Sequence, residues 1–441
     1  MILERAFRAV GILAFSLPVF AQYAGPAILS RGEAPAAIAG DEVSFRPYFE
    51  LAGVYNTGLL GIIVNSQGVA QSGAAYGLEL AAGVSGAHSW RHTKIALDYQ
   101  FGAIHYNQAS YYDGINQSLL LAVTHQFTRH TSLTLRENAG EFSGYYGFPG
   151  ITSTVPFDPT TSFVPATPFF DNRVIYAATQ ADFILQKTAR LSFDLGGEGF
   201  LARLRSTALY GTTGAGAHAD VQYRLTRRTT VGAAYMYDHF GFERVFSSTD
   251  VHSVVGTYST ALTQHLEFSV YGGMMRYETK FVQTVPVDPS ITALFGITLG
   301  NEVTYSLGYS PTVNARLAKT YKQGVAYISG GRMVIPGNGL FLTSTMNMGM
   351  VGYTYTGLRR WSMDANFSYS EGTSLAGLLG QYSDTVGTIS ISRKIKKSFH
   401  AIASFSASKY GSPGYSYYNQ VFYMARIGIG WTPGDVPLRV W

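Results

Sequence analysis

A short polar turn, flanked on both sides by alternating apolar and polar residues, recurs along almost the whole chain. It reads RLTRR from Arg224, and related turns begin at Gln126 (QFTRHT), Ala261 (ALTQH), Gly357 (GLRRW) and Lys394 (KIKKSF). The best-matched turns lie about 37–40 residues apart. A period of this length indicates one supersecondary unit used many times. Here the unit is a β-hairpin with a tight turn at one end and a variable loop at the other.

Composition narrows the class of protein further. The length of 441 residues alone suggests two or three domains, but the even spacing of the turns favours one large closed sheet. Cysteine is absent, which excludes disulfides and thiolate metal ligands. The basic residues behind the formal net charge of +5 are spread over many turns instead of forming one stripe. We therefore expect no nucleic-acid partner.

The first 21 residues have the pattern of a secretory signal peptide. Arg5 and Arg8 precede a short apolar core, and small residues stand at the two specificity positions before Gln22. The apolar core is too short to span a bilayer. We expect cleavage after Ala21, which directs the chain out of the cytoplasm.

The alternating segments each have one apolar and one polar face. From Trp361, the apolar face carries Trp361, Met363, Ala365, Phe367 and Tyr369, against Ser362, Asp364, Asn366, Ser368 and Ser370. The polar faces hold small residues and charges of both signs, and the segments are about 10–15 residues long, which suits a tilted membrane crossing. A closed barrel satisfies every backbone polar group in hydrocarbon. The pattern therefore predicts an all-β, transmembrane, antiparallel up-and-down β-barrel with the apolar face outward.

Counting the segments predicts about 18 strands, with 16 as the next best count because residues 43–56 and 72–84 are the weakest pair. We assign residues 1–21 to the signal peptide, 22–42 to a periplasmic N-terminal segment, 43–432 to the barrel and 433–441 to a C-terminal periplasmic tail. Pro311 predicts a bulge, and the change of phase after Met350 predicts a bulge or slip.

Charged residues on the polar faces are expected to line the lumen. They are Arg46, Glu50, Glu79, Asp98, Arg136, Asp182, Asp194, Glu198, Asp220, Arg224, Asp238, Glu267, Arg316, Asp364 and Arg426. Acids outnumber bases in this set, and charged rings set ion preference in a pore, so we expect a mild preference for cations. The alternative is that opposite charges pair across the wall and hold it rigid.

The four tryptophans, Trp90, Trp361, Trp431 and Trp441, all lie beside short turns or the C-terminus. Tryptophan prefers the membrane–water interface. These residues are therefore predicted to mark the periplasmic rim, with short turns on that side and longer extracellular loops opposite.

The alternating strands, the short basic turns and the aromatic-ended final strand (RIGIGWTPG) resemble a Gram-negative outer-membrane β-barrel of the porin type. The likeness covers about residues 43–432 and implies location in the bacterial outer membrane, with lipid and the barrel assembly machinery as partners. The tail after Trp431 departs from the pattern, so either Trp431 or Trp441 is the terminal aromatic residue. In porins the third loop commonly folds inward. Residues 141–172 of the third long connection are therefore expected either to constrict the lumen or to form an exposed lid.

Motifs of hydrolases, metalloproteases and phosphate-binding loops are absent from the sequence, so we expect no enzyme and no cofactor. The sequence favours a channel for passive passage of small polar solutes. One alternative is a barrel that exports a secreted polysaccharide with periplasmic export proteins, in which inward tyrosines such as Tyr48, Tyr106, Tyr176 and Tyr271 stack on sugars. Another is a non-conducting surface or scaffold barrel. Homo-oligomerisation is left open.

Overall fold

A computed structural model describes residues 46–58, 62–64, 70–107, 113–142, 173–337, 339–355, 360–375, 380–396, 398–412 and 420–433. The expected signal peptide, the N-terminal segment 22–42, nearly all of the C-terminal tail, Trp441 and loop residues 143–172 lie outside these ranges. Among the described residues, no helix is long and apolar enough to cross a membrane.

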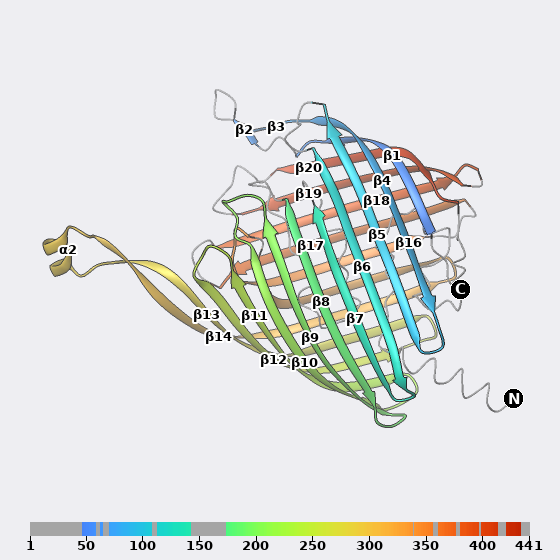
Figure 1. Cartoon of the computed structure of the whole chain (residues 1–441), viewed down its shortest axis with the longest axis horizontal. Helices are drawn as coiled ribbons and strands as arrows, with labels where there is room; N and C mark the ends of the chain where they lie inside the picture. Colours follow the sequence, from blue (N-terminus) through green and yellow to red (C-terminus); the bar gives the residue numbers. More distant parts are fainter. Residues whose placement is uncertain are drawn as a thin grey trace.

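The described residues form an antiparallel sheet of eighteen strands that closes on itself (Figure 1). Its strands are β1 (Arg46–Asn56), β4 (Ala75–Ser89), β5 (Thr93–Tyr106), β6 (Gly114–Thr128), β7 (Thr131–Phe142), β8 (Val174–Gln186), β9 (Leu191–Leu204), β10 (Thr212–Arg224), β11 (Thr229–Phe242), β12 (Ser247–Ala261), β13 (Leu266–Pro286), β14 (Leu299–Tyr321), β15 (Gly324–Ile335), β16 (Ser344–Tyr355), β17 (Trp361–Ser374), β18 (Gln381–Lys394), β19 (Phe399–Gly411) and β20 (Val421–Trp431). The predicted count of 18 is confirmed, and the weakest predicted pair corresponds to β1 and β4.

Each strand pairs with its neighbours in the chain, and β1 pairs with both β4 and β20 to close the barrel. A small separate hairpin of β2 (Ile62–Val64) and β3 (Ala70–Ser72) lies in the connection between β1 and β4. Connections at one end of the barrel have two to five residues, and those at the other end have four to 31. As in single-chain bacterial barrels, the short connections are periplasmic and the long ones extracellular.

Threonine hydroxyls stabilise several of the recurring short turns by accepting a backbone hydrogen bond. In the turn between β10 and β11, Thr226 Oγ1 accepts a hydrogen bond of 3.1 Å from the backbone N–H of Arg228. Thr128, Thr188 and Thr263 accept the same bond, from the residue two positions on, in three further turns. A hydroxyl that mimics a backbone acceptor stabilises a tight turn. The threonine therefore stabilises these four turns, and the neighbouring basic residues Arg227 and Arg228 are exposed.

The predicted bulge at Pro311 and the predicted slip after Met350 are both wrong. Pro311 faces Met274 in an unbroken β13–β14 ladder, and β15 pairs with β14 only from Val313 onward. Proline is tolerated where no ladder partner requires its missing N–H. In β16 the register is also continuous. Met346, Met348 and Met350 face inward, whereas Val351 and Tyr353 face outward. The apolar residues therefore move from the inward to the outward face along β16 without a break in register.

Two strands are longer than the predicted 10–15 residues. β13 has 21 residues and β14 has 23. They extend beyond the rim of the barrel and carry a short helix, α2 (Pro289–Phe295), at their tip (Figure 1). The Asp288 carboxylate caps this helix by accepting a hydrogen bond of 2.8 Å from the Ser290 N–H.

The outward face of the barrel is apolar. Exposed side chains on this face include Leu51, Leu78, Leu80, Leu135, Phe183, Leu195, Val221, Tyr235, Val254, Met274, Ile328, Val351, Phe367, Ile389, Phe405, Ile427 and Ile429. An exposed apolar surface spread around the whole wall is the lipid-facing belt of a transmembrane barrel. The lumen side is therefore the face on which polar chemistry gathers.

Candidate functional site

The ladder register places every charged residue of the predicted lumen set on the inward face. In the β1–β4 ladder, Glu50 is opposite Ala81, and Glu79 is opposite Ala52. The neighbouring positions on both strands hold exposed leucines that face outward, so Glu50 and Glu79 face inward. The same alternation carries Asp98, Arg136, Asp182, Asp194, Glu198, Asp220 and Asp238 inward through consecutive ladders. Arg46, Arg224, Glu267, Arg316, Asp364 and Arg426 occupy inward positions in their own ladders. Their part in conduction stays a prediction.

One cluster of these residues lies where the barrel closes. The Arg426 guanidinium of β20 donates from Nη2 to Glu50 Oε2 of β1, at 2.8 Å, and from Nε to Glu79 Oε2 of β4, also at 2.8 Å. The Glu50 side chain is 3% exposed and that of Arg426 is 19% exposed. A guanidinium shared by two carboxylates is a strong charge-assisted arrangement. We call these three residues the closure cluster.

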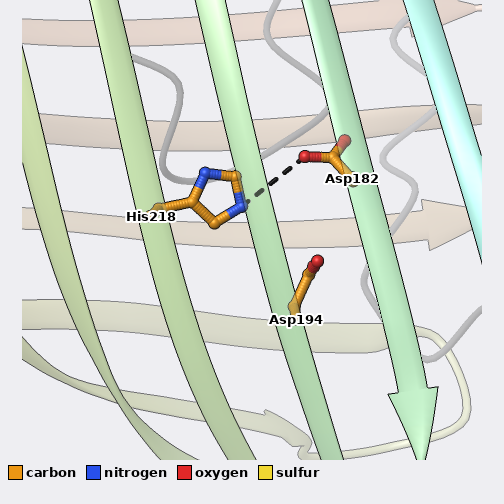
Figure 2. A group of neighbouring side chains, drawn as sticks. All are labelled: Asp182, Asp194 and His218. Carbon is orange, nitrogen blue, oxygen red and sulfur yellow. Dashed lines mark ion pairs between the residues drawn. The ribbon is translucent and has the colours of Figure 1, made fainter.

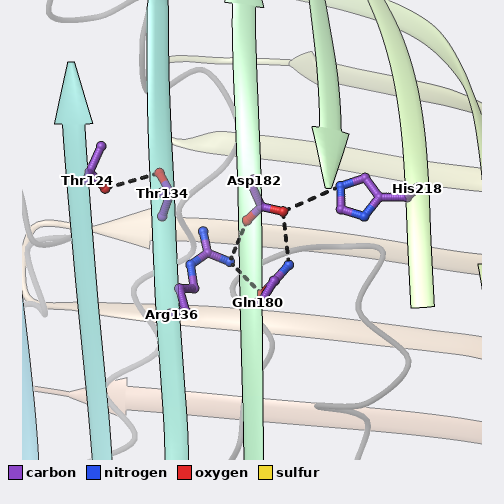
Figure 3. A network of polar contacts seen from close by, with 6 residues as sticks. All are labelled: Thr124, Thr134, Arg136, Gln180, Asp182 and His218. Carbon is purple, nitrogen blue, oxygen red and sulfur yellow. Dashed lines mark hydrogen bonds and ion pairs between the residues drawn. The ribbon is translucent and has the colours of Figure 1, made fainter. Parts of the chain in front are cut away.

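A second cluster lies on three consecutive strands, β8, β9 and β10 (Figure 2). Asp182 receives a hydrogen bond of 3.3 Å from Gln180 Nε2 and lies 3.8 Å from Arg136 Nη1. His218 Nε2 lies 3.5 Å from Asp182 Oδ1. Figure 3 shows Arg136 beside one oxygen of Asp182, Oδ2, while Gln180 and His218 both lie beside the other, Oδ1. We call Asp182, Asp194 and His218 the wall cluster.

The wall cluster has an excess of negative charge. Asp194 of β9 faces Asp220 of β10 directly in the ladder, with both side chains on the inward face. Like charges directly opposite each other destabilise a sheet. Among the described residues, this wall also presents one buried carboxylate oxygen, Asp194 Oδ1, without a hydrogen-bond donor.

An apolar layer crosses the lumen at the extracellular end. The connection between β15 and β16 enters the barrel, where the Phe341 ring stacks on Tyr382 of β18 with ring centroids 4.6 Å apart. Tyr382 in turn stacks on Tyr410 of β19. On the other side, Thr343 of the same connection hydrogen-bonds Thr249 of β12 at 2.7 Å. The connection therefore spans the lumen between β12 and β18.

More apolar residues pack against this crossing. Phe240 and Phe242 of β11, Val251 of β12 and Met275 of β13 form one buried cluster, and Leu342 packs against it. Leu209, in the connection between β9 and β10, is fully buried, and the neighbouring Tyr210 N–H donates to the Gly339 carbonyl oxygen at 2.9 Å. The layer narrows the lumen because backbone and apolar side chains occupy space that would otherwise hold water.

Sequence reasoning missed this layer. It considered residues 141–172 as either a constriction or an exposed lid, and residues 143–172 lie outside the described part of the chain. The available signal was the run Leu340–Phe341–Leu342, three apolar residues in a connection where polar residues are usual. All three pack inside the barrel, Leu340 and Phe341 in the cluster with Tyr382 and Tyr410, and Leu342 against the cluster on β11 to β13.

The inward tyrosines that were candidates for sugar stacking are buried in the wall. Tyr48, Tyr106, Tyr176 and Tyr271 are each at most 7% exposed. Three of them cover a glycine of the adjacent strand. A Cβ at Gly83 would lie 2.4 Å from the Tyr48 ring, and Gly77 and Gly140 hold Tyr106 and Tyr176 in the same way. An aromatic ring packed over a cross-strand glycine stabilises a curved sheet, and it leaves little ring face for a solute.

The described tryptophans lie at the short-turn end. Trp361 begins β17, Trp431 ends β20 and Trp90 follows β4. Trp431 and Trp90 are exposed, and the Arg393 guanidinium lies over the Trp361 ring, 5.0 Å from its centroid. This position agrees with an aromatic belt at the periplasmic interface.

A closed antiparallel barrel with an apolar outside, charged side chains inside and short turns at one end defines an outer-membrane β-barrel of the porin type. The protein therefore resides in the bacterial outer membrane.

We compared the chain with protein families, curated proteins and solved structures. No protein-family model matches the chain, and no curated protein matches it. Among solved structures, it is similar to OccK2 (OpdF) of Pseudomonas aeruginosa, with 10% identity and a TM-score of 0.41 over 89% of this chain and 98% of that one. The outer membrane protein opdK of Pseudomonas aeruginosa shows 10% identity and a TM-score of 0.39 over 88% and 98%. OccAB3 of Acinetobacter baumannii shows 10% identity and a TM-score of 0.38 over 88% and 98%. These likenesses concern the fold alone.

Proposed function

We propose that the protein is a channel through which small polar solutes cross the outer membrane passively, with the apolar layer as its narrowest part. The observation that carries this proposal is the distribution of side chains in the wall, which is the reverse of that in a soluble protein. Apolar side chains face outward around the barrel, and ionisable side chains face inward. A charged inner surface is stable only where water or paired charges solvate it. The charged inner wall therefore supports a polar path that leads past the apolar layer.

The apolar layer determines which solutes pass. The connection between β15 and β16 crosses the lumen, and Phe341 is fully buried at its centre against Tyr382. Solutes must pass beside this crossing, so molecular size is the first criterion of selection. The carboxylates of the wall cluster and of Asp220 make cations the favoured charged solutes.

Liposome swelling with uncharged sugars of increasing size tests this function. Vesicles with the refolded protein should swell with the smallest sugars, and the rate should fall steeply as sugar size grows. Phe341→Ala should admit larger sugars because it opens the crossing. The matched control is Phe405→Ala, which removes an exposed aromatic ring from the outward face of β19 and should leave the size limit unchanged.

Vesicles that contain folded protein yet do not swell with any sugar would contradict the channel and support a non-conducting scaffold. Swelling with a size limit that Phe341→Ala leaves unaltered would contradict the role of the apolar layer. Export of a polysaccharide is less well supported, because the inward tyrosines proposed for sugar contact are buried in the wall. The assembly machinery as a partner, a homo-oligomer and the lack of enzymatic activity stay predictions.

A further inference from the structure

The wall cluster combines three ligand groups of the kind that bind metal ions. One ligand atom from each of Asp182, Asp194 and His218 lies within 4.8 Å of the other two (Figure 2). Two atoms bound to one zinc ion at about 2.0–2.2 Å lie about 3.4 Å apart at the tetrahedral angle. His218 Nε2 and Asp182 Oδ1, at 3.5 Å, already have that spacing. A rotation of the Asp194 side chain completes the set.

A glycine provides the space for this arrangement. A Cβ added at Gly196 of β9 would lie 2.0 Å from His218 Cε1 and 2.6 Å from Asp182 Oδ1. Any larger residue at this position would separate the imidazole from the carboxylate. The side chains of Asp182 and His218, at 6% and 13% exposed, are thus held close together in the wall.

The electrostatics of the wall call for a cation. Asp182, Asp194 and Asp220 place three carboxylates in one region, where the Arg136 guanidinium lies 3.8 Å from Asp182. Asp194 Oδ1 is buried without a hydrogen-bond partner. A buried, unpartnered carboxylate oxygen is costly, and an ion between Asp194 and its neighbours removes that cost.

We propose that Asp182, Asp194 and His218 bind one first-row divalent transition-metal ion, such as Zn²⁺, in the lumen wall. An imidazole nitrogen with two carboxylates suits zinc and its neighbours, whereas calcium takes six to eight oxygen ligands and magnesium binds mostly oxygen and water. The three protein ligands leave one position for water or a passing solute. Arg136 approaches Asp182 Oδ2, and Gln180 donates to Asp182 Oδ1, so both side chains help to hold the carboxylate in place. This site does not depend on whether the barrel conducts.

The test is isothermal titration calorimetry of the refolded protein, purified without a polyhistidine tag, with zinc chloride in a low-chelating buffer. Wild type is expected to bind one ion per chain. Asp194→Asn and His218→Gln should each weaken that binding at least tenfold. Asp364→Asn is the matched control, because this inward carboxylate of β17 has its own partners in Thr354 and Asn366.

A second control covers the outside of the barrel. His239 and Asp250 are paired at 2.9 Å, and His252 lies on the same outward face. His252→Gln should therefore leave the lumenal binding unchanged. An excess of Mg²⁺ should not displace Zn²⁺. Correct folding of each variant is judged by the heat-dependent shift in its gel migration. In wild type, Zn²⁺ should raise the temperature of that shift, because a ligand that binds only the folded state stabilises it.

Three results would overturn the proposal. Wild type could take up no Zn²⁺ and show no thermal shift. Binding could persist in both Asp194→Asn and His218→Gln, or disappear only in His252→Gln, in which case the outward residues hold the ion. Full displacement by Mg²⁺ would exclude a transition-metal site.

Discussion

The closure cluster and the wall cluster hold similar residues in different arrangements. In the closure cluster, Arg426 lies 2.8 Å from each of two glutamates. In the wall cluster, Arg136 lies 3.8 Å from Asp182, and Asp194 faces a second aspartate. Both clusters are inward and largely buried. In the closure cluster the arginine contacts both carboxylates, whereas in the wall cluster Asp194 Oδ1 has no hydrogen-bond partner among the described residues.

The position of each cluster in the chain explains the difference. β1 and β20 meet only after the entire chain between them is in place, so their ladder has no connecting turn to hold it. Bringing together segments distant in sequence costs chain entropy, and strong charge pairing at the closure offsets part of it. β8, β9 and β10 are joined by consecutive connections. Their pairing needs less support from ion pairs, and Asp194 Oδ1 on β9 lies buried without a hydrogen-bond partner.

Removal of the shared arginine should have the largest effect. Arg426→Met leaves Glu50 and Glu79 buried without their cation, and breaking a buried ion pair from one side costs about 3–5 kcal/mol. We expect a loss of this size in the free energy of unfolding, measured by urea titration in lipid or detergent. The triple variant Arg426→Met, Glu50→Gln, Glu79→Gln should recover most of it. A triple variant no more stable than Arg426→Met would show that packing, not charge, holds the closure.

Glycine-to-alanine substitutions in the two regions should lower the free energy of unfolding by less than Arg426→Met does. A Cβ at Gly83, beside the closure, meets the Tyr48 ring at 2.4 Å and the Tyr99 carbonyl oxygen at 2.5 Å. The ring and the backbone must both move, so Gly83→Ala should cost about 1–3 kcal/mol. Gly196→Ala in the wall displaces the movable His218 and Asp182 side chains and should cost less. Gly349→Ala, with nothing within 4 Å of the added atom, is the control. Equal losses for Gly83 and Gly196 would remove this distinction between the regions.

The smallest effect should have the opposite sign. Asp220→Asn relieves the repulsion of Asp194 across the β9–β10 ladder, which is worth about 0.2–1 kcal/mol for a cross-strand pair. The variant should therefore be slightly more stable than wild type, whereas Glu50→Gln in the closure cluster should be less stable. The same urea titration compares the two. Destabilisation by Asp220→Asn would mean that the wall is as fully paired as the closure.

Much of this fold could be predicted from the sequence, because alternation with a period of two fixes both the strands and their faces. Every strand from β1 to β20 in the main sheet matches a predicted segment. The charged residues of the predicted lumen set lie on the inward face. The tight turns carry their own signal in threonines such as Thr226.

Contacts between distant segments could not be predicted in the same way. The apolar layer depends on contacts between the connection that holds Phe341 and Thr343 and strands distant in sequence, and no periodic pattern predicts such contacts. The wall cluster depends on the register that aligns Asp182 with Gly196 and Gly196 with His218. Alternation sets the face of a residue but not its partner on the next strand. The long β13–β14 extension was missed because its strands continue beyond the membrane, where the apolar belt no longer limits their length.

We propose that polar solutes cross the outer membrane through an acidic lumen. Single-channel recording of the refolded protein in a planar bilayer, with a potassium chloride gradient across it, measures this passage. We expect steady ohmic steps and a reversal potential on the cation side, which Asp194→Asn and Asp220→Asn together shift toward zero. A folded barrel that passes no current, or a reversal potential on the anion side, would contradict it.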